Sequence, residues 1–219
     1  MLLLELFAGT GSVGRVAKRK GYKVISLDFD PKTKVDIHID ILHWDYKSVD
    51  FIPDFIWASP PCNTYSAFNY FRMPNDRDKD TAEPYSERAK TGTKILYKTL
   101  EIIKYFSTKN KNMKFCIENP VGMMRKDKKM LKLYRENTSY NQYGDKRYKP
   151  TDFWANFEMN LKPVKRPDNT VTIKELSLNE RYKIPSKLIA HILDKAHTNP
   201  IIKGGYSTQE PFFDYYYTL

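Results

Sequence analysis

A short apolar run that opens directly into a glycine-rich turn constrains the fold of this chain more than any other feature. Residues 2–7 read LLLELF, a pattern typical of a strand that is buried on both faces of a sheet. The glycine-rich segment 9–14 follows, and residues 13–20 have the pattern of a helix with Ser12 as its candidate N-cap. A strand, a tight turn and a helix in this order predict the first unit of an α/β domain.

Further strands and helices alternate along the rest of the chain. Apolar runs predict four more strands, at residues 23–28, 35–40, 54–59 and 113–118. Helices are expected at residues 93–106, 127–136 and 184–197, the last capped by Ser186. Such alternation predicts an α/β fold with a mostly parallel sheet and helices on both faces. Because no repeat or linker interrupts it, residues 1–219 are expected to form a single domain.

The composition excludes several classes of protein. With 41% hydrophobic and 14% aromatic residues, the chain is not a disordered or low-complexity protein. No apolar run approaches the ~20 residues of a membrane span, and the first residues lack the basic flank and cleavage site of a signal peptide. Two cysteines are too few for a disulfide framework, and the four histidines lack metal-ligand spacing, so no metal site is expected. We therefore expect an intracellular protein, in the cytoplasm or the nucleus, with free thiols.

Positive charge gathers in one part of the sequence. The formal net charge is +11, and residues 104–149 hold thirteen Lys or Arg against four acidic residues, a net of +9. A basic stretch of this kind indicates a polyanion partner, with nucleic acid as the first candidate. The alternative is a lysine-rich surface that is only solvated.

Two acidic residues follow the glycine turn at the ends of predicted strands. Asp28 ends the second strand, where a carboxylate can accept hydrogen bonds from both hydroxyls of a ribose. Asp40 ends the third strand, close to the expected place of an adenine edge. The chain lacks the Gly-Lys-Ser/Thr sequence that binds phosphates, so an adenosine without a phosphate fits better. S-adenosylmethionine is the candidate cofactor, unless the two carboxylates only cap strand ends.

A cysteine and a glutamate follow the next two predicted strands. Residues 58–66 read ASPPCNTYS, which places Cys62 after two rigid prolines at the carboxyl end of a strand. The fifth strand ends in IENP at residues 117–120, with Glu118 second, at the same edge of the sheet. A thiol and a carboxyl group from neighbouring strand ends can therefore face one substrate. Cys116 lies inside an apolar strand and is expected in the core.

With these motifs in this order, the sequence resembles the cytosine-5 DNA methyltransferase family. The matching segments are LELFAGTGSVG, Asp28 and Asp40, SPPCNTYS, IENP, a basic segment, YGDKRYKPTDFW and IPSKLIAHIL, and they cover most of residues 2–195. The pair of SPPC and EN at strand ends is the most specific of them. The resemblance implies a Rossmann-like S-adenosylmethionine-dependent methyltransferase fold, with DNA as the substrate.

The resemblance also implies roles for individual residues. Cys62 would be the nucleophile that adds to carbon 6 of cytosine, and Glu118 would hold ring nitrogen 3 and the amino group. Arg147 would stabilise the adduct or hold the base. The resemblance also implies that Asn119 belongs to the catalytic residues. The implied cofactor-binding residues lie in the glycine turn and at the strand ends: Phe7, Gly9, Thr10, Gly11, Ser12, Asp28, Phe29, Asp40, Ile41, Ser59, Pro60 and Pro61.

Three departures distinguish this chain within that resemblance. Asn63 stands where the family usually has glutamine, and Pro120 where it usually has valine. Only residues 157–183 separate the arginine segment from the final helix, too few for the target-recognition region of standard members. Contacts to the target base would then come from the basic stretch 104–149 or from the predicted loop 63–92.

The loop 63–92 is the candidate substrate loop. It has no clear periodicity, and its Arg72, Arg77 and Arg88, with neighbouring Tyr and Phe side chains, could stack on or replace an extruded base. Its length also indicates a lid that closes over the site, unless the segment is a disordered surface loop.

The same residues leave alternative functions open. The acceptor could be RNA, single-stranded DNA or a free cytidine nucleotide, since the recognition region is missing. A partner subunit could supply target recognition, or the chain could be a catalytically inactive nucleic-acid-binding homologue. Frequent use of Lys, Asn and Tyr indicates an AT-rich genome, as in a virus or phage.

Overall fold

One sheet organises the molecule. The computed structural model describes residues 1–67, 75–167 and 176–202, which form a seven-stranded sheet in the order β3-β2-β1-β4-β5-β7-β6. The strands are β1 (Leu2–Leu6), β2 (Lys23–Asp28), β3 (Ile37–His38), β4 (Phe55–Ala58), β5 (Lys114–Pro120), β6 (Tyr134–Ser139) and β7 (Pro150–Ala155). β7 alone runs antiparallel to its neighbours β5 and β6, so the sheet of the described residues is mostly parallel, as the sequence predicts.

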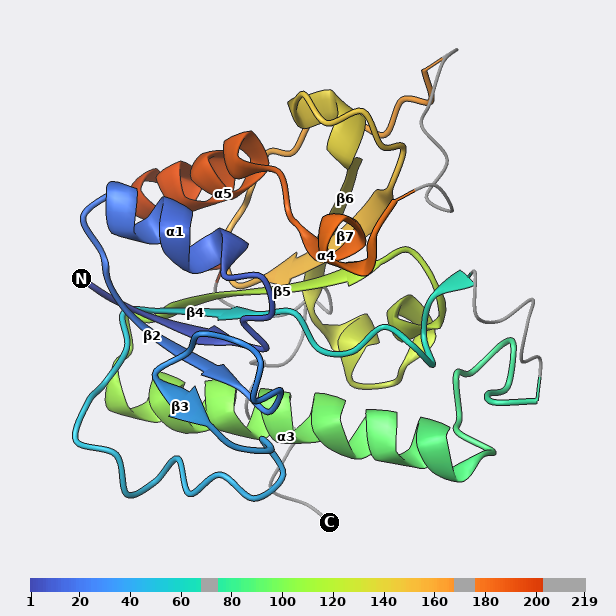
Figure 1. The fold of residues 1–219 in the computed structure, drawn as a ribbon, viewed down its shortest axis with the longest axis horizontal. Helices are drawn as coiled ribbons and strands as arrows, with labels where there is room; N and C mark the ends of the chain where they lie inside the picture. The colour runs from blue at the N-terminus through green and yellow to red at the C-terminus, as the bar shows by residue number, and fades with distance from the viewer. Residues whose placement is uncertain (68–74, 168–175, 203–219) are drawn as a thin grey trace.

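Helices cover both faces of this sheet, which confirms the predicted α/β architecture (Figure 1). α1 (Ser12–Arg19) and α5 (Ser186–Thr198) pack side by side on one face, and α3 (Glu87–Lys109) lies along the other. The shorter elements are α4 (Leu178–Tyr182) and the 3-10 helices η1 (Met123–Lys126), η2 (Met130–Lys132) and η3 (Tyr140–Tyr143). None of the described helices is both long and apolar enough to cross a membrane.

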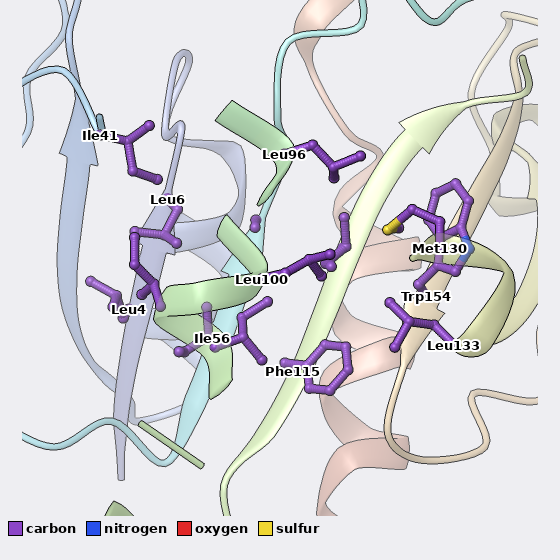
Figure 2. Close-up of a cluster of buried hydrophobic side chains, with 14 of the residues drawn as sticks. Leu4, Leu6, Ile41, Ile56, Leu96, Leu100, Phe115, Met130, Leu133 and Trp154 are labelled. Carbon is purple, nitrogen blue, oxygen red and sulfur yellow. The ribbon is translucent and has the colours of Figure 1, made fainter. Parts of the chain in front are cut away.

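Two layers of apolar side chains, one on each face, hold the helices to the sheet. Leu3 of β1 belongs to the layer under α1 and α5, whereas Leu4 and Leu6 point to the opposite face and share a cluster with Leu96 of α3 (Figure 2). The continuous apolar run therefore still follows the two-residue alternation of a strand, with both sides buried. Full burial of a leucine side chain stabilises the folded state by about 2 kcal/mol.

A buried glutamate interrupts this apolar strand. Glu5 of β1 is 3% exposed, and its Oε2 accepts the backbone N–H of Gly14 in α1 at 2.9 Å. A Cβ on residue 14 would lie 2.6 Å from that oxygen, so glycine is needed for this close approach of helix and strand. Burial raises the pKa of Glu5 to about 7, and hydrogen bonds from the start of α1 oppose the shift.

The two predicted N-cap serines do not cap their helices. Gly11, with a φ of +64°, takes the N-cap position of α1, and Ser12 is the first helical residue. Pro185 takes the N-cap position of α5, so Ser186 also lies inside its helix. An N-cap residue must leave the helical conformation, and here the glycine and the proline do so.

Two other predicted segments fold differently from expectation. Residues 127–136 do not form a helix: they contain η2 and begin β6, because Tyr134–Ser139 pairs with β7. α3 begins at Glu87, inside the predicted loop 63–92, where the Ser86 side chain caps it. The connection between β4 and α3 is therefore shorter than the sequence predicts.

Candidate active site

The first part of the candidate site is the turn that follows β1. Phe7 and Gly9 have φ angles of +62° and +47°, so the backbone turns sharply after the strand. The Gly9 N–H donates to Oδ2 of Asp28 at 2.8 Å, and the Asp30 N–H donates to Oδ1 at 2.9 Å. The buried Asp28 carboxylate thus fixes the glycine turn against the end of β2, and each of its oxygens keeps a second lone pair for a ligand.

Backbone hydrogen bonds bring the ends of several strands to the same edge as this turn. The Ser59 N–H, after β4, donates to the Leu6 carbonyl of β1 at 3.3 Å. The Ile39 N–H, after β3, donates to the Asp28 carbonyl at 3.1 Å, and Asp40 follows directly. The carboxyl ends of parallel strands form the ligand-binding edge of an open α/β sheet, and the predicted cofactor residues lie along it.

The other predicted cofactor residues surround the turn. Phe29 is 69% exposed beside Asp28, which leaves its ring accessible to a planar group. Ile41 is buried in the core that faces α3. Thr10 Oγ1 donates to Ser12 Oγ at 3.4 Å, so the hydroxyl groups of two predicted cofactor-binding residues lie together.

This side of the edge fits the adenosyl part of S-adenosylmethionine. The Asp28 oxygens can receive the two ribose hydroxyls, and the Phe29 ring can stack on adenine. A Cβ built on Gly9 would lie 3.9 Å from the Phe7 carbonyl oxygen, so a ligand can approach the turn without meeting a side chain.

The second part of the candidate site surrounds Cys62, which follows Pro60 and Pro61 beyond the end of β4. Its carbonyl accepts the N–H groups of Tyr65 at 3.0 Å and Ser66 at 2.9 Å, so a tight turn begins at the cysteine. The prolines fix the approach to this turn and the two hydrogen bonds fix its exit. The thiol is therefore held in one place at the sheet edge.

Two charged side chains act on this thiol. Burial raises the pKa of Cys62, the ammonium group of Lys149 lowers it, and the carboxyl group of Glu118 raises it further. The three side chains come from the exit of β4, the end of β5 and the entrance of β7. The structure thus brings together Cys62 and Glu118, as the sequence predicts, and adds Lys149.

Glu118 and Asn119 point to opposite faces of β5, and each makes one contact that matters for the site. Glu118 is buried, and its Oε1 accepts the hydroxyl hydrogen of Tyr140 at 3.1 Å. Asn119 is fully buried, and its Nδ2 donates to the Pro60 carbonyl at 2.8 Å. Asn119 thereby joins the end of β5 to the proline turn. This hydrogen bond helps to fix the backbone that leads to Cys62.

A second contact joins the same two segments. The Met123 N–H donates to the Tyr65 carbonyl at 2.6 Å, and Ser66 forms an antiparallel bridge with Gly122. A Cβ on residue 122 would lie 2.1 Å from the Tyr65 carbonyl oxygen, so only glycine permits this approach of two backbones. The cysteine turn is therefore attached to the exit of β5 on both sides of Cys62.

Arg147 is buried and its donors have partners within the protein. Its Nε and Nη2 donate to the Asp145 carboxylate, and its Nη1 donates to the Glu180 carbonyl. Nη2 also reaches the Lys183 carbonyl at 2.9 Å. The bond to Asp145 raises the pKa of Arg147. These contacts connect Arg147 to the segment around α4, and its predicted role toward the base stays a prediction.

Lys149 is the residue that the sequence analysis missed. Its Nζ donates to the Arg181 carbonyl at 3.3 Å and to the Tyr140 hydroxyl at 3.5 Å, and its charge acts on Cys62. The sequence does contain a signal for Lys149. Residues two apart on an extended segment share a side, so the predicted site residue Arg147 indicates Lys149 as a second cation. Because β7 is antiparallel to β5, Lys149 lies at this edge although it precedes its strand in the sequence.

The predicted substrate loop contains an arginine with a structural role. Arg77 is 2% exposed and donates to the carbonyls of Thr64, Ala82 and Ala89, which ties the loop to the start of α3. The prediction that Arg77 stacks on or replaces an extruded base is therefore wrong. Arg88 is exposed and pairs with Asp76, and Arg72 lies outside the described residues.

The expectation about the second cysteine is confirmed. Cys116 is buried in the core under α5, as predicted. Within the described ranges, no cluster of three or more His, Cys, Asp or Glu side chains is arranged to hold a metal ion.

Comparison with known proteins shows a likeness in fold. No family model matches the sequence, and no curated protein sequence matches it either. The methyltransferase EhMeth of Entamoeba histolytica is similar in structure, with a TM-score of 0.50, 15% identity, and coverage of 78% of this chain and 61% of that chain. The fold is thus the Rossmann-like α/β fold of methyltransferases.

Two further solved structures are similar at lower scores. The Dnmt2 methyltransferase of S. pombe has a TM-score of 0.47 and 17% identity, covering 71% of this chain and 48% of that chain. A triple mutant of DNMT2 from Spodoptera frugiperda has a TM-score of 0.46 and 15% identity, covering 77% and 56%. The chain spans about half the length of the first solved chains that it matches.

Proposed function

We propose that this protein is an S-adenosylmethionine-dependent methyltransferase that transfers a methyl group to carbon 5 of cytosine in DNA. One observation carries the proposal: Asn119 joins the end of β5 to the proline turn that leads to Cys62, and Tyr140 contacts both Glu118 and Lys149. The thiol, the carboxyl group and the ammonium group therefore lie at one sheet edge, where both charged groups act on the thiol. The glycine turn and Asp28 lie along the same edge, in a fold that methyltransferases share. A nucleophile, a proton donor and a cation are the groups that activation of a pyrimidine ring requires.

Cys62 begins the proposed reaction as a thiolate, which the positive charge of Lys149 favours. The sulfur uses its electron pair to form a bond to carbon 6 of cytosine, and the electrons of the 5,6 double bond become available at carbon 5. Glu118 gives a proton to ring nitrogen 3, which neutralises the ring as the sulfur adds.

The remaining residues position the cofactor and complete the cycle. S-adenosylmethionine, when bound, would supply an electrophilic methyl group to carbon 5, with the methyl–sulfur bond breaking and S-adenosylhomocysteine as the leaving group. Asp28 would hold the ribose and Phe29 the adenine, so that the methyl group meets the ring from the glycine-turn side. Loss of the carbon 5 proton to water then restores the double bond, Cys62 leaves as a thiolate, and Glu118 takes back the proton from nitrogen 3.

The choice of DNA as the acceptor rests on charge. The stretch 104–149 has a net charge of +9, which favours a polyanion as the partner, and Lys149 at the end of this stretch acts on Cys62 itself. The described part of residues 157–183 contains α4 and no separate domain. The same chemistry on RNA, single-stranded DNA or a free cytidine nucleotide, or with a partner subunit that selects the target, would also fit this arrangement.

Methyl transfer from labelled S-adenosylmethionine tests the proposal directly. Duplex DNA, single-stranded DNA, RNA and cytidine nucleotides are offered separately to the wild-type protein, Cys62→Ala and Glu118→Ala. We expect transfer to duplex DNA by the wild type, none by Cys62→Ala, and a strongly reduced but measurable rate in Glu118→Ala. Transfer to another acceptor alone would correct the substrate, and binding of cofactor and DNA without any transfer would mean an inactive homologue.

A covalent trap separates this mechanism from other methyl transfers. DNA that contains 5-fluorocytosine blocks the last elimination, because carbon 5 then carries no proton to lose. A stable protein–DNA adduct is expected with the wild type and not with Cys62→Ala. Methyl transfer that survives in Cys62→Ala would exclude the covalent route.

A further inference from the structure

We propose that Tyr140 is a positioning residue that orients the catalytic carboxyl group of Glu118. In this proposal its hydroxyl group holds Oε1 and thereby leaves Oε2 as the oxygen that would face nitrogen 3 of cytosine and transfer the proton to it. The inference rests on the proposed function and adds a residue to it that no sequence motif indicated.

Tyr140 occupies the centre of a charged cluster without touching solvent. It begins η3, its side chain is 0% exposed, and its hydroxyl lies 3.1 Å from Glu118 Oε1. The guanidinium of Arg147 lies 5.3 Å from the ring centroid and the ammonium of Lys149 lies 4.8 Å from it. Both cations therefore lie near the ring, and the hydroxyl group contacts the buried carboxyl group of Glu118 and the ammonium group of Lys149.

The direction of the Tyr140 hydrogen bond follows from its neighbours. Burial and the nearby Glu118 raise the pKa of Tyr140 well above its usual value, so the phenol keeps its single hydrogen. Lys149 is only a donor, and its Nζ lies 3.5 Å from the phenol oxygen. The phenol oxygen therefore accepts from Lys149 and donates to Glu118, which gives a chain of bonds with one consistent direction.

This direction decides which oxygen of Glu118 is presented to the base. Oε1 receives the Tyr140 hydrogen, so Oε2 is the oxygen that would face ring nitrogen 3 and transfer the proton to it. Oε2–H is then the donor for ring nitrogen 3, while the second lone pair of Oε1 can accept from the amino group of the base. Without the hydroxyl, the carboxyl group could rotate and present either oxygen.

A pair of tyrosine variants tests the proposal. Tyr140→Phe removes the hydroxyl and keeps the ring under both cations. Tyr143→Phe is the matched control, because this residue is also buried in η3 but its hydroxyl accepts the N–H of Lys162 at 3.0 Å, away from Glu118. We expect kcat on cytosine-containing DNA to fall about 10-fold in Tyr140→Phe, with KM and cofactor affinity within about twofold of wild type. Tyr143→Phe should keep its kcat.

A double-mutant cycle distinguishes orientation of Glu118 from a general packing effect. The rate of adduct formation with 5-fluorocytosine DNA is measured in Tyr140→Phe, Glu118→Ala and the double variant. If Tyr140 acts through Glu118, its loss should have no further effect once the carboxyl group is absent. Additive losses, equal losses in the two tyrosine variants, or an unchanged kcat in Tyr140→Phe would overturn the inference. An inactive wild type would instead refute the proposed function.

Discussion

The glycine-turn side of the sheet edge is built on β1 and β2, two strands that follow one another in the sequence, whereas the cysteine side is held by contacts between distant segments. The glycine-turn side comprises residues 7–14 and 28–30, and the cysteine side comprises residues 59–66, 118–123 and 145–149. Asp28 joins the two segments of the glycine-turn side through the Gly9 N–H, beside the hydrogen bond from the Ala8 N–H to the Leu27 carbonyl. On the cysteine side, Asn119 and Gly122 each join the exit of β5 to the turn that holds Cys62.

The two sides also place their charges differently. On the glycine-turn side an acid faces outward to the edge at the end of a parallel strand, which is the usual arrangement in such sheets. On the cysteine side the cation Lys149 precedes β7, and it reaches the edge because Thr151 of antiparallel β7 pairs with Pro120 at the end of β5. Reversing one strand therefore lets a strand entrance and a strand exit share one site.

The largest expected effect concerns the backbone contact on the cysteine side. Gly122→Ala would place a Cβ 2.1 Å from the Tyr65 carbonyl oxygen and push the cysteine turn away from β5. We expect adduct formation by Cys62 to be lost, and the free energy of unfolding to fall by about 3 kcal/mol, as for overpacked interiors. Urea unfolding and the 5-fluorocytosine trap measure the two effects.

Gly21→Ala is the control for this substitution. Gly21 has a φ of +84° with no atom within 4 Å of an added Cβ, so the variant should lose only about 1 kcal/mol from backbone strain. Its adduct formation should equal that of the wild type. If Gly122→Ala also keeps its adduct, the two segments do not support Cys62 through this contact.

The glycine-turn side could be predicted from sequence because its information is local. Residues 2–7 carry their own burial pattern, and the turn that follows needs only neighbouring glycines. β1 and β2 accordingly end within one residue of the predicted ranges. The sequence predicts Cys62 and Glu118 at one edge for the same reason. Cys62 follows one apolar strand, and Glu118 lies near the end of another.

The rest depends on pairing between remote segments, which no local pattern encodes. Residues 127–136 combine lysines with spaced apolar residues, and their strand character comes from β7 as a partner. The position of Lys149 also depends on β7, because the antiparallel direction of β7 brings its first residues to the end of β5 that holds Glu118. The sequence predicts Arg77 in an irregular loop, but Arg77 is buried because α3 begins at Glu87 and packs against this part of the loop.

The second prediction uses the buried acid beneath the glycine turn. The pKa of Glu5 is about 7 in the folded protein and near 4.3 in an unfolded chain, so the folded state binds the proton more tightly. Its contribution to stability is greatest below the unfolded value and is lost as pH rises from about 4.5 to 7. Between pH 5 and pH 8 we expect the free energy of unfolding to fall by about 2 kcal/mol. Glu5→Gln should remove this slope.

Urea unfolding at several pH values checks the Glu5 slope against a matched acid. Glu158 is exposed, so Glu158→Gln should keep the slope of the wild type. An equal slope in the wild type and Glu5→Gln would show that another group titrates. A rise in pH therefore has opposite consequences on the two sides. It lowers stability through Glu5, near the glycine turn, and it forms the Cys62 thiolate that the proposed reaction needs.

The third prediction changes the cation on the cysteine side. Lys149 lowers the pKa of Cys62, so Lys149→Met raises it and leaves less thiolate at neutral pH. We expect the rising limb of the pH–rate profile to move to higher pH, and the rate at pH 7 to fall about 10-fold. Lys149→Arg should keep most of the rate, because the charge is retained.

Lys146→Met serves as the control for nonspecific loss of charge. Lys146 is exposed three residues earlier in the same segment, so its removal should weaken binding of DNA most at low salt and should leave the pH profile unchanged. A pH profile of Lys149→Met that coincides with that of the wild type would mean that the ammonium group does not act on the thiol.

The smallest expected effect returns to the single carboxylate of the glycine-turn side. Asp28→Asn replaces one acceptor oxygen by an amide, which then faces the N–H of either Gly9 or Asp30. We expect the affinity for S-adenosylmethionine, measured by calorimetry, to fall about fivefold, because a charge-assisted contact to a ribose hydroxyl becomes neutral. Asp40→Asn, at an exposed position where Oδ1 already accepts the N–H of Leu42, should change it by less than about twofold. If both variants lose affinity equally, Asp28 has no special place on this side, and the turn itself holds the cofactor through its backbone.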